Sequence, residues 1–539
     1  MDIFLLIVII LFVVAALDLI VGVSNDAVNF LNSAIGSKVA PFKTIMVIAT
    51  LGILAGSFSS SGLMEVARKG VFDPSMFTYE SIMFLFLAVM LTDIILLDFF
   101  NEIGMPTSTT VSIVFELLGA ATMIAFLLIA AQKGGSENMA DFIKVGKAMK
   151  IVGGIFSSIL IAFTLGAVVQ FFSRWALTFN YQHKLDSTAP IFAGLAITAI
   201  TYFLFVKGIK STPFAKTSTG EETQFYHYIK NNIPTVVGIL FAFWTLLNFI
   251  LKKVANVNPL KTVVLAGTFA LAMAFAGNDL VNFIGVPIGA FQSYGFAQES
   301  GLAANEMLMT RLNEAVEVPL YLLGLSGLIM AITLWTSSKA RKVTETEINL
   351  ARQDEGEERF KPNFLANGIV KLGETIGKGL EVITPIPMKT SIKNSYVARI
   401  FTTEMREEDK PAFDLIRASV NLMMASIVIS YATFKKMPLS TTYVSFMVAM
   451  GTSLADKAWG RESAPYRVAG VLNVIGGWLM TALIAFTAAA IFAFILFKLK
   501  LIGIILVVAL AIFALFRSHF AFKRKEKALA EARASQGNH

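Results

Sequence analysis

Blocks of hydrophobic residues, each about as long as a membrane helix, alternate with short polar segments along most of the chain. A helix that crosses a bilayer needs about 20 apolar residues, and it satisfies its own backbone hydrogen bonds inside lipid. The pattern therefore predicts an all-α, polytopic membrane protein with about 12 transmembrane segments. The apolar blocks cover residues 3–23, 44–63, 81–100, 111–131, 151–172, 189–206, 234–251, 261–284, 318–336, 413–434, 444–454, 468–494 and 502–516.

The blocks and the polar segments between them divide the chain into six parts. A long polar stretch interrupts the second half, and basic residues on its flanks, such as Lys339 and Lys393, favour the cytoplasmic side of the membrane. The predicted parts are a first membrane repeat (1–172), connecting transmembrane helices (173–260), the first part of a second membrane repeat (261–336), a hydrophilic loop insertion (337–410), the remainder of the second repeat with the last helix (411–517) and a basic C-terminal tail (518–539).

Composition narrows the class of protein further. The 539 residues are 55% hydrophobic and only 15% charged, whereas soluble domains carry about 25% charged residues. The absence of cysteine excludes disulfide frameworks, thiolate catalysis and iron–sulfur clusters. The net charge of +8 is explained by basic flanks of membrane helices and a basic tail, so no nucleic-acid partner is expected. With no nucleophile–base pair, phosphate-binding loop or metal cluster in the sequence, neither an enzyme nor an ATP-driven pump is expected.

The chain also resembles itself. Asp26, in the segment Ser-Asn-Asp-Ala-Val-Asn-Phe, corresponds to Asp279 in Gly-Asn-Asp-Leu-Val-Asn-Phe, 253 positions later. A second segment, Met-Pro-x-Ser-Thr-Thr, recurs 332 positions later and also pairs Gly119 with Gly451. The difference between the offsets is close to the length of the polar insertion, which lies between the second copies. Two halves with broken segments at matching positions indicate a transporter with inverted-topology repeats and a site at their interface.

The repeated Asn-Asp-x-x-Asn motif predicts a cation site. Two asparagines four positions apart share one face of a helix, with the aspartate beside them. A carboxylate inside a membrane helix is costly unless it is paired, and carboxylate and amide oxygens suit an alkali cation or a proton. Hydrogen bonding between helices by asparagine is the structural alternative. The candidate cation ligands are Asn25, Asp26, Asn29, Asn278, Asp279 and Asn282.

The repeated Pro-x-Ser-Thr-Thr motif predicts an anion site. It directly precedes the apolar blocks that begin at Val111 and Val444, which are expected to be broken or re-entrant helices. Hydroxyl groups added to the free N–H groups and positive dipole of a helix start make a cradle for a small tetrahedral oxyanion. Plain N-capping is the alternative. The candidate substrate-binding residues are Ser108, Thr109, Thr110, Ser440, Thr441 and Thr442, with Asp26 and Asp279 as acceptors for a proton carried by the oxyanion.

Three further acidic residues, Asp93, Asp98 and Glu116, lie in or near the segments around the first hydroxyl motif. Each of them could be a ligand in a cation site, or could instead face water or form a salt bridge.

The paired motifs resemble those of the inorganic phosphate transporter family, the Pit and type III sodium–phosphate carriers. The matching segments are Gly22 to Asn29, Ala276 to Asn282, Pro106 to Thr110 and Pro438 to Thr442, together with the hydrophilic loop between the halves. The resemblance implies cation-coupled phosphate uptake by inverted repeats, with phosphate held by the hydroxyl segments and sodium near the Asn-Asp motifs. Many members have a histidine directly after Ser-Thr-Thr, where this chain has Val111 and Tyr443. That departure favours sodium over a proton.

The expected function is therefore symport of inorganic phosphate with sodium, or less favourably with protons, across a membrane that we take to be a bacterial inner membrane. Sodium would be the coupling ion, and no other cofactor or metal is expected. The expected partners are phosphate, the cation and the lipid bilayer, and a homodimer is compatible with a symmetric carrier. The alternatives are a sulfate or other oxyanion permease of the same fold, an anion channel, and a sensor that signals through the polar loop.

Overall fold

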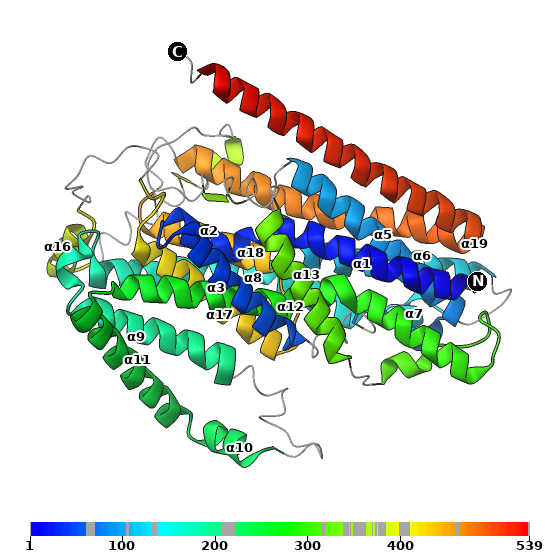
Figure 1. Cartoon of the computed structure of the whole chain (residues 1–539), viewed down its shortest axis with the longest axis horizontal. Coiled ribbons are helices and arrows are strands. Elements are labelled where there is room, and N and C mark those ends of the chain that lie inside the picture. Colours follow the sequence, from blue (N-terminus) through cyan, green and yellow to red (C-terminus); the bar gives the residue numbers. More distant parts are fainter. Residues whose placement is uncertain are drawn as a thin grey trace.

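Helices make up nearly all of the regular structure in the computed structural model (Figure 1). It describes residues 2–60, 70–103, 107–131, 137–206, 222–314, 318–337, 384–397, 410–458 and 464–536, with positions 344, 347–348, 363–368, 370–371 and 375. Within these residues, extended pairing is limited to two isolated bridges, Phe72 with Ile143 and Thr78 with Leu308. The prediction of an all-α protein is confirmed. Most of the predicted hydrophilic loop, 337–410, lies outside the described residues.

Long helices follow one another through the first half of the chain and the connecting region. They are α1 (Ile3–Asp26), α2 (Val28–Gly36), α3 (Phe42–Ser57), α5 (Tyr79–Ile103), α6 (Thr109–Ala131), α7 (Met139–Phe142), α8 (Val145–Leu177), α9 (Thr188–Thr201), α10 (Gln224–Asn231) and α11 (Ile233–Ala255). Short turns of other helix types lie between them: η2 (Pro74–Met76), η3 (Tyr181–Lys184) and η4 (Tyr202–Val206).

The second half contributes α12 (Pro259–Ser300), η6 (Thr310–Asn313), α13 (Leu320–Thr336), α16 (Ile386–Ser395), α17 (Leu415–Phe434), α18 (Thr441–Ala455) and α19 (Ala464–Gln536). Figure 1 shows most long helices running along the long axis of the molecule, with α10 and α11 (green) at one edge and the end of α19 (red) at the other.

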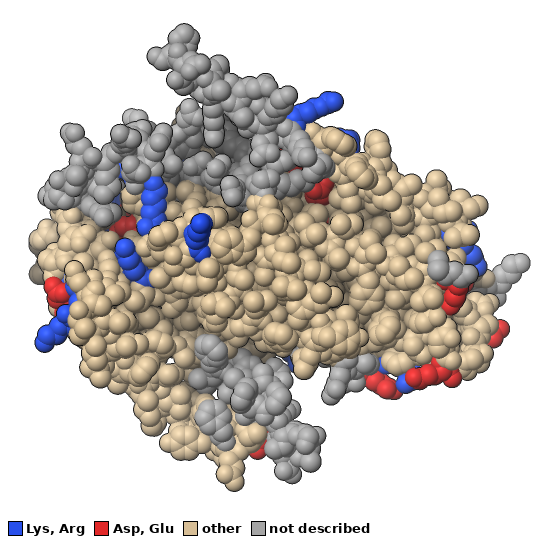
Figure 2. Space-filling view, viewed as in Figure 1, with Lys and Arg blue, Asp and Glu red and all other residues tan. Residues whose placement is uncertain are grey.

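The helices have the length and polarity of membrane spans. Eight helical stretches among the described residues are long and apolar enough to cross a membrane by length and composition, and α3, α9 and α13 lie within three shorter apolar stretches. Figure 2 shows a broad band without charged side chains across the middle of the visible face. The chain is therefore a multi-pass membrane protein, while the number of about 12 spans stays a prediction.

Two helices differ in length from the predicted blocks. The block 261–284 forms only the first part of α12, which continues through Pro287 to Ser300. Ile288 and Ala290 just beyond the proline are buried, so packing keeps this segment helical despite the lost backbone N–H. The last two blocks form two helices, in agreement with the pattern; both carry the label α19 and are separated at Lys500, whose backbone is not helical (φ +48°). The predicted C-terminal tail continues as helix to Gln536.

The glycines paired by the sequence repeat make the same kind of helix contact in both halves. A Cβ on Gly119 of α6 would collide with the carbonyl oxygen of Phe486 on α19, and one on Gly451 of α18 with that of Phe163 on α8. Small residues let membrane helices approach this closely. Both hydroxyl motifs thus begin a helix whose backbone is in direct contact with a neighbouring helix.

We expect the substitution Gly451→Ala to destabilise the protein by about 1–3 kcal/mol, because a methyl group forced into a packed interface shifts the backbone. Gly476→Ala is the matched control, since a Cβ on Gly476 of α19 meets nothing within 4 Å. Thermal unfolding of the detergent-solubilised protein should show a lower melting temperature for Gly451→Ala alone. Equal melting temperatures for the two variants would contradict the close contact.

A cluster of four buried ionic side chains joins α8, α17 and the end of α18. Arg174 of α8 pairs with Asp414 at 2.7 Å and with Asp456 at 2.6 Å. Arg417 of α17 donates from Nε to Asp456 at 3.0 Å, and Gln170 donates to the same carboxylate at 2.8 Å. Two positive and two negative charges balance within the cluster, which is the condition under which buried ions are tolerated.

Candidate functional site

The four repeated motifs meet in the centre of the helix bundle. The first Asn-Asp motif lies where α1 ends at Asp26 and α2 begins at Val28, and the second lies within the continuous helix α12. The hydroxyl motifs form the starts of α6 and α18, although Pro106 lies outside the described residues. Every candidate side chain is at most 4% exposed, so the site is closed to solvent.

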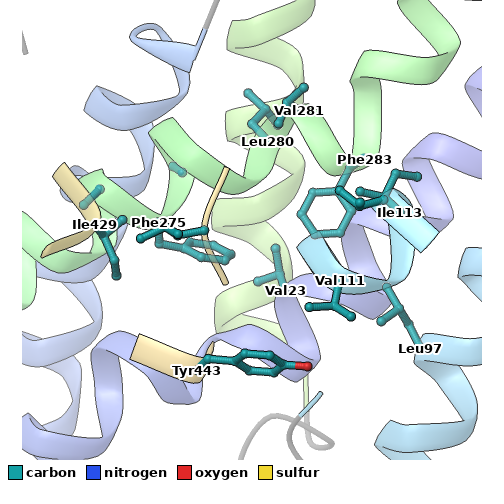
Figure 3. Packing of buried hydrophobic residues seen from close by; sticks show 14 of the residues in the cluster. Val23, Leu97, Val111, Ile113, Phe275, Leu280, Val281, Phe283, Ile429 and Tyr443 are labelled. Atoms are coloured by element: carbon teal, nitrogen blue, oxygen red, sulfur yellow. The ribbon is translucent and has the colours of Figure 1, made fainter. Parts of the chain in front are cut away.

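Apolar packing holds the motif helices together around the site. Gly22 of α1 faces α12 so closely that a Cβ there would collide with the ring of Phe283. Figure 3 shows Val23 of α1, Val111 of α6 and Phe283 of α12 lying side by side. The Asn-Asp segments of the two halves are therefore fixed against the helix starts that carry the hydroxyl groups.

The serine of each hydroxyl motif caps its own helix. Ser108 Oγ accepts from the backbone N–H of Val111 at 3.1 Å, and Ser440 Oγ accepts from that of Tyr443 at 3.0 Å. The capping alternative is thus observed for both serines. A capping hydroxyl still carries its own O–H donor, so the same group remains able to donate to an anion.

The threonine hydroxyls reach the aspartates both within one half and across the two halves. Each carboxylate accepts one hydroxyl from each hydroxyl motif, so both motifs converge on both aspartates. Asp26 accepts from Thr109 at 3.1 Å and from Thr442 at 3.0 Å, while Asp279 accepts from Thr441 and, at 3.5 Å, from Thr110.

The first asparagine of each Asn-Asp motif links the aspartate to the segment of chain before the hydroxyl groups. Asn25 Nδ2 donates to Asp26 at 2.8 Å and to the carbonyl oxygen of Thr107 at 2.7 Å. Asn278 makes the matching bonds, to Asp279 at 2.6 Å and to the carbonyl oxygen of Leu439 at 2.8 Å. Each amide therefore orients its neighbouring carboxylate.

The second asparagine of each motif reaches the opposite half. Asn29 donates towards Thr441 at 3.3 Å and Thr442 at 3.2 Å. Asn282 donates towards Thr109 at 3.2 Å and Thr110 at 3.0 Å. These contacts and those to the aspartates recur at the same two sequence offsets, so the two halves present the same groups to a common centre.

Two contacts of the site are not repeated in the other half. Ser445 of α18 donates to Asn29 Oδ1 at 3.0 Å, and the residue 332 positions earlier is Ile113. Thr433 donates to Asn278 Oδ1 at 3.3 Å, where the first half has Asn101, which donates to the carbonyl of Val21. Sequence reasoning missed Ser445, whose only signal is its place one turn after the hydroxyl triplet.

The polar loop also touches the site helices. Glu347 is buried, and its Oε1 accepts from Asn32 of α2 at 2.8 Å. Burial raises the pKa of Glu347 to about 8, although the Asn32 hydrogen bond opposes the shift. The hydroxyls of Ser24 and Ser337 lie 2.7 Å apart. The start of the loop is therefore attached to the helix pair that carries the first Asn-Asp motif.

The site combines groups that can donate hydrogen bonds to an anion with groups that can coordinate a cation. Asp26 and Asp279 are fully buried and share one group of threonine hydroxyls, and the hydrogen bonds described above bring them no Lys or Arg. Two carboxylates in one low-dielectric site favour the binding of a cation or a proton. The hydroxyl hydrogens, with the N–H groups at the starts of α6 and α18, are donors for an anion.

Comparison with known proteins places this arrangement in a family. A protein of Pyrococcus horikoshii assigned as a phosphate permease is 24% identical over 337 residues, which cover 60% of this chain and 74% of that protein. A Pyrococcus furiosus protein with the same assignment is 25% identical over 66% of this chain and 79% of its own length. A solved structure described as the sodium-dependent phosphate transporter has the same fold, with a TM-score of 0.59, 16% identity and coverage of 92% of this chain and 100% of its own.

The profile of the phosphate transporter family matches residues 22–346. This range contains both Asn-Asp motifs and the first hydroxyl motif, and it confirms the resemblance drawn from those segments. The chain therefore belongs to the phosphate transporter family.

Proposed function

We propose that this protein is a secondary active transporter that carries inorganic phosphate together with sodium ions across a cell membrane. The family consists of transporters and not of enzymes, in agreement with the expectation from sequence. The observation that carries the proposal is that each of two buried aspartates receives hydroxyl groups from both halves. Ligands for a cation and donors for an anion thus share one closed site.

Phosphate fits the polarity of this site. The hydroxyls of both Ser-Thr-Thr segments and the free backbone N–H groups at the two helix starts would donate to its oxygens. Asp26 and Asp279 would accept the proton of a phosphate hydroxyl, which sulfate lacks. The assignment of the relatives as phosphate permeases supports phosphate over the sulfate alternative.

Sodium fits the remaining ligands. The Asp26 and Asp279 carboxylates, the Asn25 and Asn278 amide oxygens and nearby backbone carbonyls are hard oxygen ligands, which suit an alkali cation. The structural relative is described as sodium-dependent, and this supports the choice of cation. In a low-dielectric site, the bound cation lowers the free-energy cost of bringing in the anion and the reverse also holds, so the two bind cooperatively.

Uptake of radiolabelled phosphate into proteoliposomes tests the proposal. We expect an inward sodium gradient to drive accumulation, and excess sulfate to compete poorly. A proton gradient without sodium should drive far less uptake. Accumulation of sulfate in place of phosphate would overturn the substrate, and fast, non-saturating flux without coupling would indicate a channel.

We expect Thr442→Val to lower phosphate uptake, measured as kcat/KM, by roughly 10- to 100-fold. The change removes a hydroxyl that donates to Asp26 at 3.0 Å, and a hydrogen bond to a charged group contributes about 1.5–3 kcal/mol. Thr442→Ser keeps the hydroxyl and should retain most activity. Thr487→Val on α19 is the control for the same change on an exposed helix face. Equal uptake by Thr442→Val and Thr487→Val would contradict the assigned role.

A further inference from the structure

A second group of buried acidic side chains lies apart from the duplicated site. Asp18 of α1, Asp93 of α5 and Glu116 of α6 are each 0% exposed. Asp18 precedes Asp26 by eight residues on the same helix, which places the two about 12 Å apart along its axis. Asp98, which sequence analysis grouped with Asp93 and Glu116, instead lines a cavity between α5 and α19.

Asp93 links the other two carboxyl groups of this cluster. Asp93 lies within hydrogen-bonding reach of both Asp18 and Glu116. The Ser112 hydroxyl donates to Glu116 Oε1 at 2.7 Å. Among the described residues, no donor is hydrogen-bonded to either oxygen of Asp18 or Asp93 or to Oε2 of Glu116, because the Ser112 hydroxyl, which also faces Asp93, donates to Glu116 instead. Carboxylates carry no hydrogen, so these contacts become hydrogen bonds only when a proton lies between the oxygens.

No positive charge balances this cluster among the described residues that surround it. From α1 Asp18 faces Asp93, and from α6 Glu116 does, while the charge of Asp26 acts on Asp18. α12 and α19 also pack on α5. The acidic residue that α12 brings to this region is Asp279, and on α19 Lys500 pairs with Glu80 and Arg517 with Glu102 at the two ends of α5. Three unpaired negative charges at 0% exposure would be far more costly than a protonated cluster.

The cluster belongs to one half of the chain only. At the offsets of the repeat, its counterparts in the second half are Leu271, Ala425 and Val448, all apolar and buried. The same helix packing is therefore built there without acidic residues, so the architecture itself does not require them. Across the described residues, no group of three or more acidic or histidine side chains has the geometry of a metal site. A proton thus fits the cluster better than a metal ion.

We propose that Asp18, Asp93 and Glu116 form a buried proton-binding site, separate from the duplicated site, whose proton occupancy changes during transport. A carboxylate oxygen of the cluster takes up a proton from water to form a carboxyl O–H, and that O–H later returns the proton to water. The link to transport rests on the proposed function as a phosphate carrier, whereas proton binding by the cluster does not.

Infrared spectroscopy of the full-length protein in lipid tests the site directly. Protonated carboxyl groups give a C=O stretch that is separate from the carboxylate bands and shifts in heavy water. We expect Asp93→Asn and Glu116→Gln, made singly, each to remove part of this band. Asp73→Asn is the control: although burial opposes it, hydrogen bonds from Ser75 and Asn313 and the nearby Lys144 lower the pKa of Asp73, which is therefore ionised. A band unchanged in both cluster variants would overturn the proton site.

Sodium-driven phosphate uptake over a range of pH tests the link to transport. We expect the uptake rate of the native protein to depend on pH and that of Asp93→Asn to lose this dependence while uptake persists. The same pH profile in both proteins would overturn the change of occupancy during transport. If the native protein takes up no phosphate under any gradient, the proposed function fails, and the infrared band still decides whether the cluster binds a proton.

Discussion

Asp26→Asn and Asp279→Asn should each lower sodium-driven phosphate uptake by roughly 100-fold or more. Each aspartate accepts hydroxyl groups from both halves and lies beside an asparagine that orients it. An amide in its place removes the negative charge that would hold a cation, and it turns an NH₂ group towards donors that need an acceptor. Loss of one partner from a buried, hydrogen-bonded charge pair costs about 2–5 kcal/mol, and 1.4 kcal/mol corresponds to tenfold.

The two variants should fail to a similar degree, because the contacts of Asp26 and Asp279 match at the offset of the repeat. Glu102→Gln is the control, since Glu102 pairs with Arg517 at the end of α5 and away from the site. Uptake is measured in proteoliposomes, after the folding of each variant is confirmed by its elution as a single species. Native uptake by either aspartate variant would rule out a shared, two-carboxylate cation site.

The Asn-Asp residues of the site could be predicted from sequence because burying polar and charged side chains in a membrane helix costs free energy, which a functional role would explain. Asp26 and Asp279 lie in strongly apolar surroundings, and their flanking asparagines recur at one offset. A duplicated pattern of this kind identifies the groups without a structure. The starts of α6 and α18 were also predictable, since serine and threonine directly before an apolar run mark the start of a helix.

The partners of these residues could not be predicted. Asn29 donates to hydroxyl groups more than 400 positions away. This pairing depends on which helices lie next to each other in the folded bundle, and the sequence does not give that order. The serines turn towards their own helices, which is a local choice between two acceptable geometries. Asp18 was overlooked because one acidic residue in a first membrane helix gives no pattern until Asp93 and Glu116 are placed beside it.

Asp456→Ala should destabilise the protein by about 3–5 kcal/mol, because it removes one of the two carboxylates that balance the buried guanidinium groups of Arg174 and Arg417. Asp456 accepts from Nε and Nη2 of Arg174, from Nε of Arg417 and from Gln170. In its absence, the two guanidinium groups of the cluster share the single remaining carboxylate of the cluster, that of Asp414. We expect a large fall in the melting temperature of the detergent-solubilised protein. Glu299→Ala is the control, since the Arg311–Glu299 pair is equally short, at 2.6 Å, but exposed, and such pairs contribute less than about 1 kcal/mol.

A double variant separates charge imbalance from loss of packing. Asp456→Leu with Arg417→Met removes one charge of each sign and leaves Arg174 paired with Asp414 at 2.7 Å. Replacing a buried ion pair by apolar residues is often neutral, whereas removing one partner is not. The double variant should therefore melt at a higher temperature than Asp456→Leu alone. Equal melting temperatures of the two variants would mean that the cluster stabilises the junction of α8, α17 and α18 through packing, and that the balance of its charges contributes little.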